Sequence, residues 1–245
     1  MINYKKYIAA LICLCLGMSV LHAQDAEVLL QNMDNLIAAP KDKQAVVKIV
    51  LTNKSGKEKI REANLMQKGM FKKLYRYTKP EKKAGIATLS LPDGIMWLYM
   101  PSFEKPIKIS LLSKSQAFNG TDFSHEDMSG IPYSERYQPT LVNSDIEGTY
   151  LLELLPKIKK LKYSKIMVYL DKTYNYPVKM KYFNKSNKYA KVCTYKYAKQ
   201  ATYWYAQEVL MTDVKKEHST GIFLTDVKFD QGLTDDEFTV EKLKQ

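Results

Sequence analysis

The chain has 245 residues, with 38 lysines and arginines against 26 aspartates and glutamates, and its formal net charge at pH 7 is +12. A surface this basic favours anionic lipid, acidic protein or nucleic acid as a partner, unless the lysines only keep the surface solvated. The three cysteines are too few for a disulfide framework once Cys13 and Cys15 are removed with the leader described below, so a hydrophobic core must stabilise the fold.

Residues 1–23 have the pattern of a secretory signal peptide. Lys5 and Lys6 precede an uncharged apolar run, which ends at the small residue Ala23. The run is shorter than the roughly 20 apolar residues that span a membrane, although an uncleaved N-terminal anchor is the alternative. Large residues precede Cys13 and Cys15, whereas a lipoprotein signal requires a small one, so we expect no lipid anchor.

The remaining chain, residues 24–245, is predicted to form one domain that is secreted to the periplasm. No further run of apolar residues is long enough to suggest a membrane span. A periplasmic location argues against nucleic acid as a partner.

The domain is predicted to begin with an amphipathic helix and to continue as strands. Apolar residues at three- and four-residue spacing between Ala26 and Ala38 predict the helix, and Pro40 ends it. Alternating or β-branched segments separated by polar turns then predict a meandering antiparallel sheet of about eleven strands. They span residues 45–53, 60–67, 71–77, 85–91, 95–100, 106–112, 150–155, 165–170, 178–183, 191–198, 203–211 and 221–229.

One segment interrupts this pattern. Residues 113–143 contain Phe118, Phe123 and Met128 among polar residues, which predicts short helices and loops. Their apolar side chains need a surface to bury against. The concave face of the sheet would provide it, so we expect this segment to act as a plug or lid.

Nothing in the sequence indicates catalysis. His125 and His218 lie far apart in the chain, outside any metal-binding spacing, and Cys193 lies in a strand pattern where a buried, inert thiol is expected. We therefore expect neither enzymatic activity nor a cofactor or metal. The cluster Asp122, His125, Glu126 and Asp127 could belong to a metal site if a further ligand joined it, but we favour a helix start capped by Thr121 or Asp122, with the acids in the first turn.

The strand at residues 95–100 is uncharged on both faces and includes Trp97 and Tyr99. Such a strand is either an ordinary core strand covered on both sides or one that lines an apolar ligand cavity. The sequence pattern alone leaves both interpretations open.

Two motifs together resemble the LolA-like outer-membrane lipoprotein-sorting family. The first is the strand end WLYMP, which contains Trp97, Tyr99 and Pro101, and the second is FNGTDFSHEDM at residues 118–128. The second motif includes Gly120, Asp122, Glu126 and Asp127 and is long enough to be specific. The resemblance extends over essentially all of residues 24–245.

The resemblance implies a mostly β fold, a half-open antiparallel barrel with an N-terminal helix and a helical lid. It also implies a periplasmic carrier that holds the acyl chains of lipoproteins or other lipids and helps sort them to the outer membrane. An inner-membrane exporter and an outer-membrane acceptor would be its partners. The alternative is a non-enzymatic accessory protein of an envelope export or assembly complex. The expected cavity and lid residues are Trp97, Tyr99, Phe118, Gly120, Phe123 and Met128, with Pro101, Asp122, Glu126 and Asp127 as further motif residues.

Overall fold

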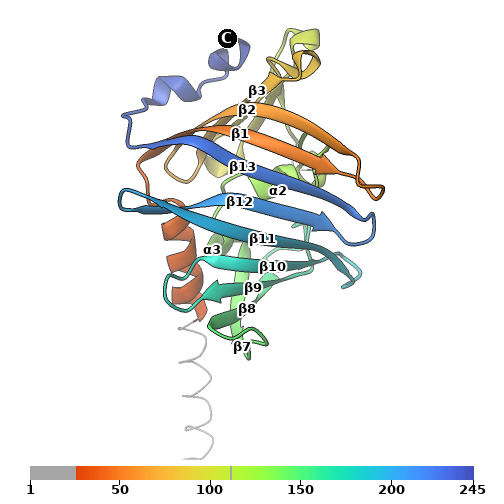
Figure 1. Ribbon diagram of the computed structural model, residues 1–245, viewed down its shortest axis with the longest axis vertical. Helices are drawn as coiled ribbons and strands as arrows, with labels where there is room; N and C mark the ends of the chain where they lie inside the picture. Colours follow the sequence, from red (N-terminus) through yellow and green to blue (C-terminus); the bar gives the residue numbers. More distant parts are fainter. Residues whose placement is uncertain (1–25, 111) are drawn as a thin grey trace, which may run out of the picture.

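The computed structural model describes residues 26–110 and 112–245, so the predicted signal peptide lies outside the described residues. Thirteen strands form one antiparallel sheet in the order β6-β5-β4-β3-β2-β1-β13-β12-β11-β10-β9-β8-β7 (Figure 1). Their bounds are β1 Asp42–Thr52, β2 Glu58–Lys68, β3 Lys72–Lys79, β4 Ala87–Ser90, β5 Met96–Tyr99, β6 Ile107–Lys108, β7 Tyr137–Val142, β8 Thr149–Pro156, β9 Lys165–Asp171, β10 Pro177–Phe183, β11 Tyr189–Gln200, β12 Tyr203–Asp213 and β13 His218–Phe229.

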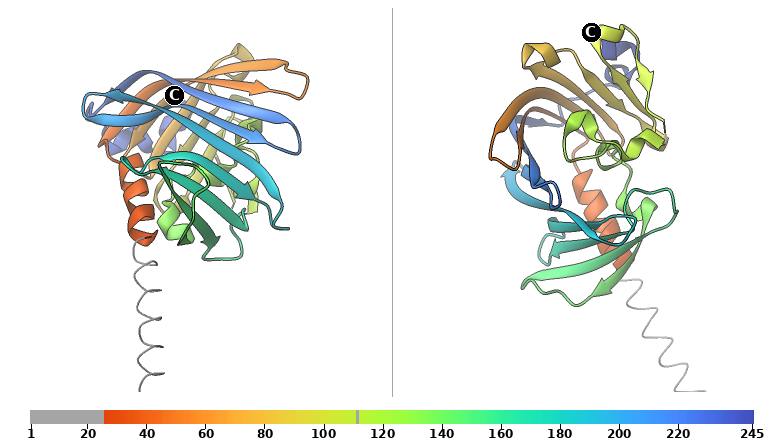
Figure 2. Two further views of the ribbon diagram at one scale, coloured as in Figure 1. Left: turned by 60° about the horizontal axis from the view of Figure 1, so that its bottom comes forward. Right: turned by 90° about the vertical axis from the view of Figure 1, so that its right-hand side faces the viewer.

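The sheet meanders except where β1 pairs with β13, which joins the two halves of the chain. It curls into an arch, and its edge strands β6 and β7 do not pair with each other (Figure 2). The expectation of a half-open antiparallel barrel is therefore confirmed. The described residues form 13 strands rather than about eleven.

Strand β7 lies inside the segment for which helices and loops were predicted. Pro139 obscures its strand pattern, because proline cannot donate a ladder hydrogen bond. The structure accommodates Pro139 because β7 is an edge strand whose only neighbour is β8. The same segment also contains the short helices α2 His125–Met128 and α3 Tyr133–Arg136, as expected.

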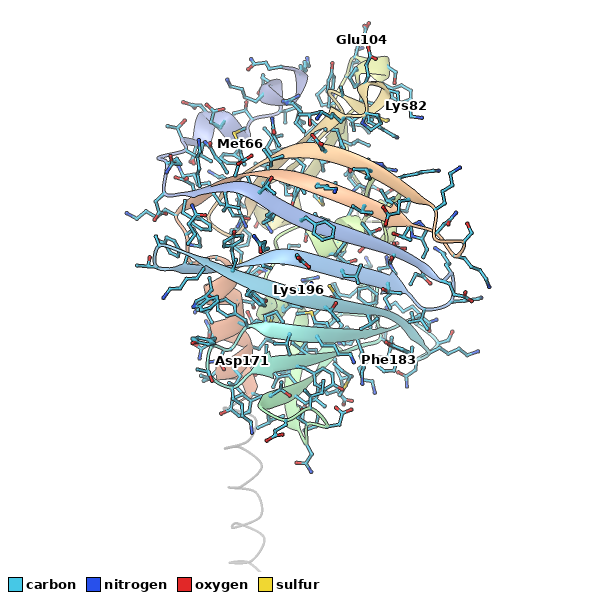
Figure 3. The ribbon with its side chains drawn as sticks, viewed as in Figure 1. Met66, Lys82, Glu104, Asp171, Phe183 and Lys196 are labelled. Atoms are coloured by element: carbon cyan, nitrogen blue, oxygen red, sulfur yellow. The ribbon has the colours of Figure 1, made fainter. Side chains whose placement is uncertain are left out.

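Alternating side chains give each strand one buried face. On β1, Ala45, Val47, Ile49 and Leu51 are buried on the concave face, whereas Lys48 between them is exposed. On β11, Cys193 is buried while Lys196 lies on the outer face, which is turned toward the viewer in Figure 3. This period of two follows from the pleat of the strand.

The N-terminal helix, described over residues 26–37, lies against the concave side (Figure 2). Ala26, Leu30 and Met33 are fully buried and belong to the core formed by β8–β12. This buried row has the three- and four-residue spacing that predicted the helix.

The end of the chain covers part of the convex face. Two short 3-10 helices, Asp235–Phe238 and Glu241–Lys244, contribute Phe238 and Leu243 to a cluster with Leu74, Ala87 and Leu89. Met66, labelled in Figure 3, packs against the same cluster from β2. Arg76 donates hydrogen bonds to the carbonyl oxygens of Lys242 and Leu243, at 2.5 and 3.0 Å, and so holds this segment on the sheet.

Candidate functional site

The interior of the arch is the candidate site, and the lid segment, residues 118–128, lies within it. Phe118 and Phe123 are only 3% and 7% exposed and share a core cluster with Leu152, Ile166 and Met211 of the sheet. Met128 packs against the same cluster. The predicted position of this segment on the concave face is therefore observed (Figure 1).

Two ring contacts hold Phe118. Its ring lies edge-on to Tyr75 of β3, with centroids 5.8 Å apart, and edge-on to His125 of α2, with centroids 5.5 Å apart. Burial, and then the nearby Lys162, lowers the pKa of His125, which favours a neutral ring at this contact. Gly120 has φ +76° beside Asn119 at φ +49°, so the turn before α2 uses left-handed backbone.

A capping box starts α2. The Ser124 hydroxyl accepts a hydrogen bond from the Asp127 N–H at 3.2 Å, and the Asp127 carboxylate accepts from the Ser124 N–H at 2.7 Å. The sequence predicted Thr121 or Asp122 as the cap of this helix. That prediction was wrong, because the cap is Ser124. Glu126 and Asp127 do lie in the first turn, where acidic side chains are favourable.

Asp122 fastens the lid segment to the sheet, and Glu126 fastens it to α3. Asp122 accepts from Thr220 Oγ1 at 2.6 Å and contacts His218 Nδ1 at 2.7 Å, while its main-chain carbonyl accepts from Lys191. Glu126 forms an ion pair with Arg136 at 3.5 Å, and both side chains are buried. Within the described residues, no group of three potential metal-ligating side chains occurs.

A cavity of about 230 Å³ lies inside the arch, between the sheet and the end of the N-terminal helix. Aromatic side chains of β11–β13 form one wall, and the end of the N-terminal helix together with residues 130–133 forms another. The aromatic lining residues are Tyr133, Tyr176, Tyr195, Tyr197, Trp204, Tyr205 and Phe229. Lys43, Gln67 and Lys73 line the cavity beside this wall, since Lys43 pairs with Phe229. A largely apolar lining with a few charged groups is typical of a small-molecule site.

The structure does not bring Trp97 and Tyr99 to the lid segment. In the register, Trp97 pairs with Leu89 and Leu89 with Leu74, so these side chains share a face. That face is the convex one, where Trp97 and Tyr99 pack against the cluster that contains Phe238. Tyr75, which contacts Phe118, points to the other side of β3 from Leu74.

Pro101 has a packing role near this strand. A Cβ on Gly85, which has φ +81°, would lie 3.0 Å from Pro101 Cγ. The family motif around Trp97 therefore corresponds here to tight packing of β4, β5 and the following turn, on the face away from the cavity.

Cys193 is fully buried and forms no disulfide, as the strand pattern predicted. Burial raises the pKa of its thiol to about 12. A thiol with such a pKa carries almost no thiolate at neutral pH, and the thiolate is the nucleophile.

Sequence reasoning missed Lys43 and Lys73. A usable signal was present, because each occupies an inward position of its strand: Lys43 lies two residues before Ala45, and Lys73 two residues before Tyr75. A lysine in phase with the buried side chains departs from the period-two pattern and marks a position that packing alone does not explain. Among the described residues, no helix has the length and apolar character that crossing a membrane requires.

Comparison with known proteins finds one family model that matches most of the chain and solved structures with the same fold. A family model described as "Uncharacterized protein" matches residues 69–245. No curated protein matches the chain significantly. A domain from Vibrio parahaemolyticus described as an outer membrane lipoprotein-sorting protein is 27% identical, with a TM-score of 0.84, over 91% of this chain and 100% of its own.

Two further solved structures share the fold. A DUF1329 family protein from Desulfovibrio piger is 22% identical, with a TM-score of 0.83, over 91% of this chain and 99% of its own. A LolA superfamily protein from Nitrosomonas europaea is 22% identical, with a TM-score of 0.74, over 87% of this chain and 97% of its own.

Proposed function

Because the chain belongs to the family whose model matches residues 69–245 and has the fold of LolA-superfamily proteins, we propose that it is a periplasmic carrier of acyl chains. The chains would belong to lipoproteins or other lipids on their way to the outer membrane. An inner-membrane exporter would load the carrier, and an outer-membrane acceptor would unload it. The observation that carries the proposal is the cavity on the concave side of the arch. Its walls are the aromatic side chains of the sheet, the end of the N-terminal helix and residues 130–133.

The size of the cavity bears on how a ligand would enter. Pockets for small molecules typically measure about 300–1,000 Å³, and this one measures about 230 Å³. A full acyl chain therefore needs more space than this cavity offers, and we propose that the lid segment, which contributes Asp127 to the lining, moves to provide it. Phe118 and Phe123 are the large side chains of that segment, and both are buried against the sheet.

The energies allow such an exchange. Burial of two phenylalanines contributes roughly 3–6 kcal/mol. An acyl chain of about 14 carbons contributes about 0.8 kcal/mol for each buried methylene, or roughly 11 kcal/mol in all. The ligand term is the larger one, so an acyl chain can displace both rings even after some polar contacts of the lid segment are broken.

Lipid content and probe binding test the proposal. We expect the purified protein to release lipid into organic solvent, as detected by mass spectrometry, and the emptied protein to bind a fluorescent fatty acid. A protein that carries no lipid and binds no probe would instead be an accessory protein of an envelope complex, with its interior filled by its own lid segment.

A disulfide across the lid tests gating. The Asp122 N–H donates to Thr220 Oγ1 at 3.0 Å, so cysteines at these two positions lie within disulfide reach. In Asp122→Cys/Thr220→Cys with Cys193→Ala, oxidation should reduce probe binding severalfold, and reduction should restore it. Thr220→Cys with Cys193→Ala is the control and should respond to neither treatment. Equal binding by oxidised and reduced protein would show that residues 118–128 do not gate the cavity.

A further inference from the structure

The cavity contains two cationic side chains that no acid neutralises. Lys43 of β1 and Lys73 of β3 both line it. Over residues 26–110 and 112–245, neither Nζ takes part in an ion pair or a hydrogen bond with another side chain or carbonyl. Unpaired ammonium groups inside a protein are unfavourable, so an arrangement of this kind calls for an anion.

The other charged side chains of the cavity already have partners. Arg136 pairs with Glu126 and stacks on Tyr133, with its guanidinium carbon 4.6 Å from the ring centroid. Asp34 accepts from the N–H groups of Tyr133 and Ser134, at 3.0 and 2.8 Å. Asp127 accepts from Ser124 and from the Tyr163 hydroxyl. Both carboxylates are thus oriented by these hydrogen bonds, and within the described residues neither of them forms an ion pair with Lys43 or Lys73.

Sheet register places the two lysines on one row. Lys43 pairs with Gln67, and Gln67 pairs with Lys73, so the three side chains lie side by side on the concave face of β1, β2 and β3. Neighbouring strands are about 4.8 Å apart, which separates the lysine backbones by roughly 10 Å. Flexible lysine side chains can approach a common anion from both sides of such a gap.

Electrostatics agree with this geometry. Burial lowers the pKa of Lys43 to about 8. Burial, followed by the positive charges of Lys43 and Arg136, lowers the pKa of Lys73 to about 8. Part of each side chain remains accessible, and both line the cavity, so a bound anion could reach them.

The row ends at an aromatic surface. Lys43 pairs on its other side with Phe229, which lines the cavity with Tyr205 and Trp204. Next to Lys73, Gly130 presents no side chain, and a Cβ there would lie 3.2 Å from Lys73 Nζ. The cavity therefore offers a cationic end, against which residue 130 packs closely, and an apolar wall that begins beside Lys43.

We propose that this cavity selects an amphiphile with an anionic head group, a carboxylate or a phosphate, which binds between Lys43 and Lys73 while its acyl chain lies along the aromatic wall. The inference rests on the proposed function and narrows its ligand class. A free fatty acid and a lysophospholipid with a phosphate monoester carry the same recognised chemistry. The two sources differ in head-group charge and size, so they can be compared directly.

Displacement of the neutral probe N-phenylnaphthylamine by three competitors tests the proposal. The competitors are palmitic acid, palmitic acid methyl ester and palmitoyl lysophosphatidic acid. At pH 7 we expect one or both anionic competitors to bind about tenfold more tightly than the ester, which corresponds to about 1.4 kcal/mol. The tighter of the two anions identifies the head group.

Variants test the two lysines. Lys43→Met/Lys73→Met removes both charges with little change in volume and should reduce the preference for the anion to about one- to twofold, with the ester still bound. Lys48→Met, on the exposed face of the same strand, should keep the full preference. Wild-type protein that binds neither anionic competitor more tightly than the ester, or a double variant that keeps its preference, would overturn the inference and leave the carrier proposal standing. Wild-type protein that binds none of the three competitors would overturn both.

Discussion

Lys43 and Lys73 show how the meaning of a single residue depends on its phase in a strand. The chain has many lysines, and most need no explanation beyond solvation. Lys48 faces outward on β1, whereas Lys43 on the same strand faces the cavity. The two positions are five residues apart, an odd offset, and a strand turns its side chains over at each residue, so the same residue type serves two different purposes.

The lowered pKa values of Lys43 and Lys73 predict a pH dependence. Both fall from 10.5 to about 8 in the folded chain, so the unfolded chain binds more protons between about pH 8 and 10.5. The free energy of unfolding should therefore rise with pH across this window through these two groups. Binding of a fatty acid anion should weaken as pH rises through about 8, since the lysines lose their charge.

Urea unfolding and probe displacement at several pH values between 7 and 10.5 check this prediction. The difference between wild type and Lys43→Met/Lys73→Met isolates the lysine contribution from that of the other titratable or charged groups that face the cavity. Those groups are Asp34, Asp127, Tyr133, Arg136, Tyr176, Tyr195, Tyr197 and Tyr205. Parallel pH profiles for the two proteins would show that neither lysine titrates in the window.

At the scale of elements, polar contacts hold the lid segment and α3 in addition to the burial of Phe118 and Phe123. Asp122, Glu126 and Asp127 each bind a different neighbour, and Asp34 of the N-terminal helix caps the start of α3. Burial of apolar side chains against the concave face, which the sequence predicted, is therefore only part of what holds the segment. Sequence reasoning identified the acids as a helix start but could not find their partners on distant strands.

At Gly130, the segment after α2 approaches the main chain of Met70 so closely that no side chain fits between them. Its φ is +76°, and a Cβ there would lie 2.4 Å from the main-chain oxygen of Met70. Gly130→Ala should destabilise the protein by more than the about 1–2 kcal/mol of left-handed strain alone, and should alter probe affinity.

Gly56→Ala is the matched control for this substitution. Gly56 has the same φ of +76°, but nothing lies within 4 Å of its Cβ position. Its loss of unfolding free energy, measured in urea, should therefore report the backbone strain without the clash. If both variants lose the same stability, the close approach of residue 130 to Met70 contributes nothing.

At the scale of the whole molecule, the sheet has two faces with different tasks. The concave face carries the cavity and the lid segment, and the convex face of β2–β5 carries the C-terminal segment with Phe238 and Leu243. This division separates residues that the motifs had grouped. Trp97 lies against the C-terminal segment, and Phe123 lies against the cavity side.

Trp97→Ala and Phe123→Ala should therefore differ. Loss of the half-buried indole should lower the free energy of unfolding by about 1.5–3 kcal/mol and leave probe affinity within about twofold, because Trp97 faces away from the cavity. Phe123→Ala should change both stability and affinity. Urea denaturation and probe titration measure the two quantities, and a clear loss of affinity in folded Trp97→Ala protein would contradict the assignment of faces.

Local patterns in the sequence determined most of the fold. The spacing of Leu30 and Met33 predicted the N-terminal helix, alternation predicted most strands, and the motif at residues 118–128 located the lid segment. These features depend on periodicity and short-range chemistry, which a sequence displays directly.

Only the tertiary structure decided which face of the sheet each residue serves. A strand that is apolar on both faces, such as the one with Trp97, reads the same whether a cavity or a terminal segment covers it. The pairing of Lys43, Gln67 and Lys73 likewise depends on the register of three strands, which the alternating pattern does not show. The cavity therefore comes from side chains far apart in the chain, and the curvature of the sheet brings them to one place.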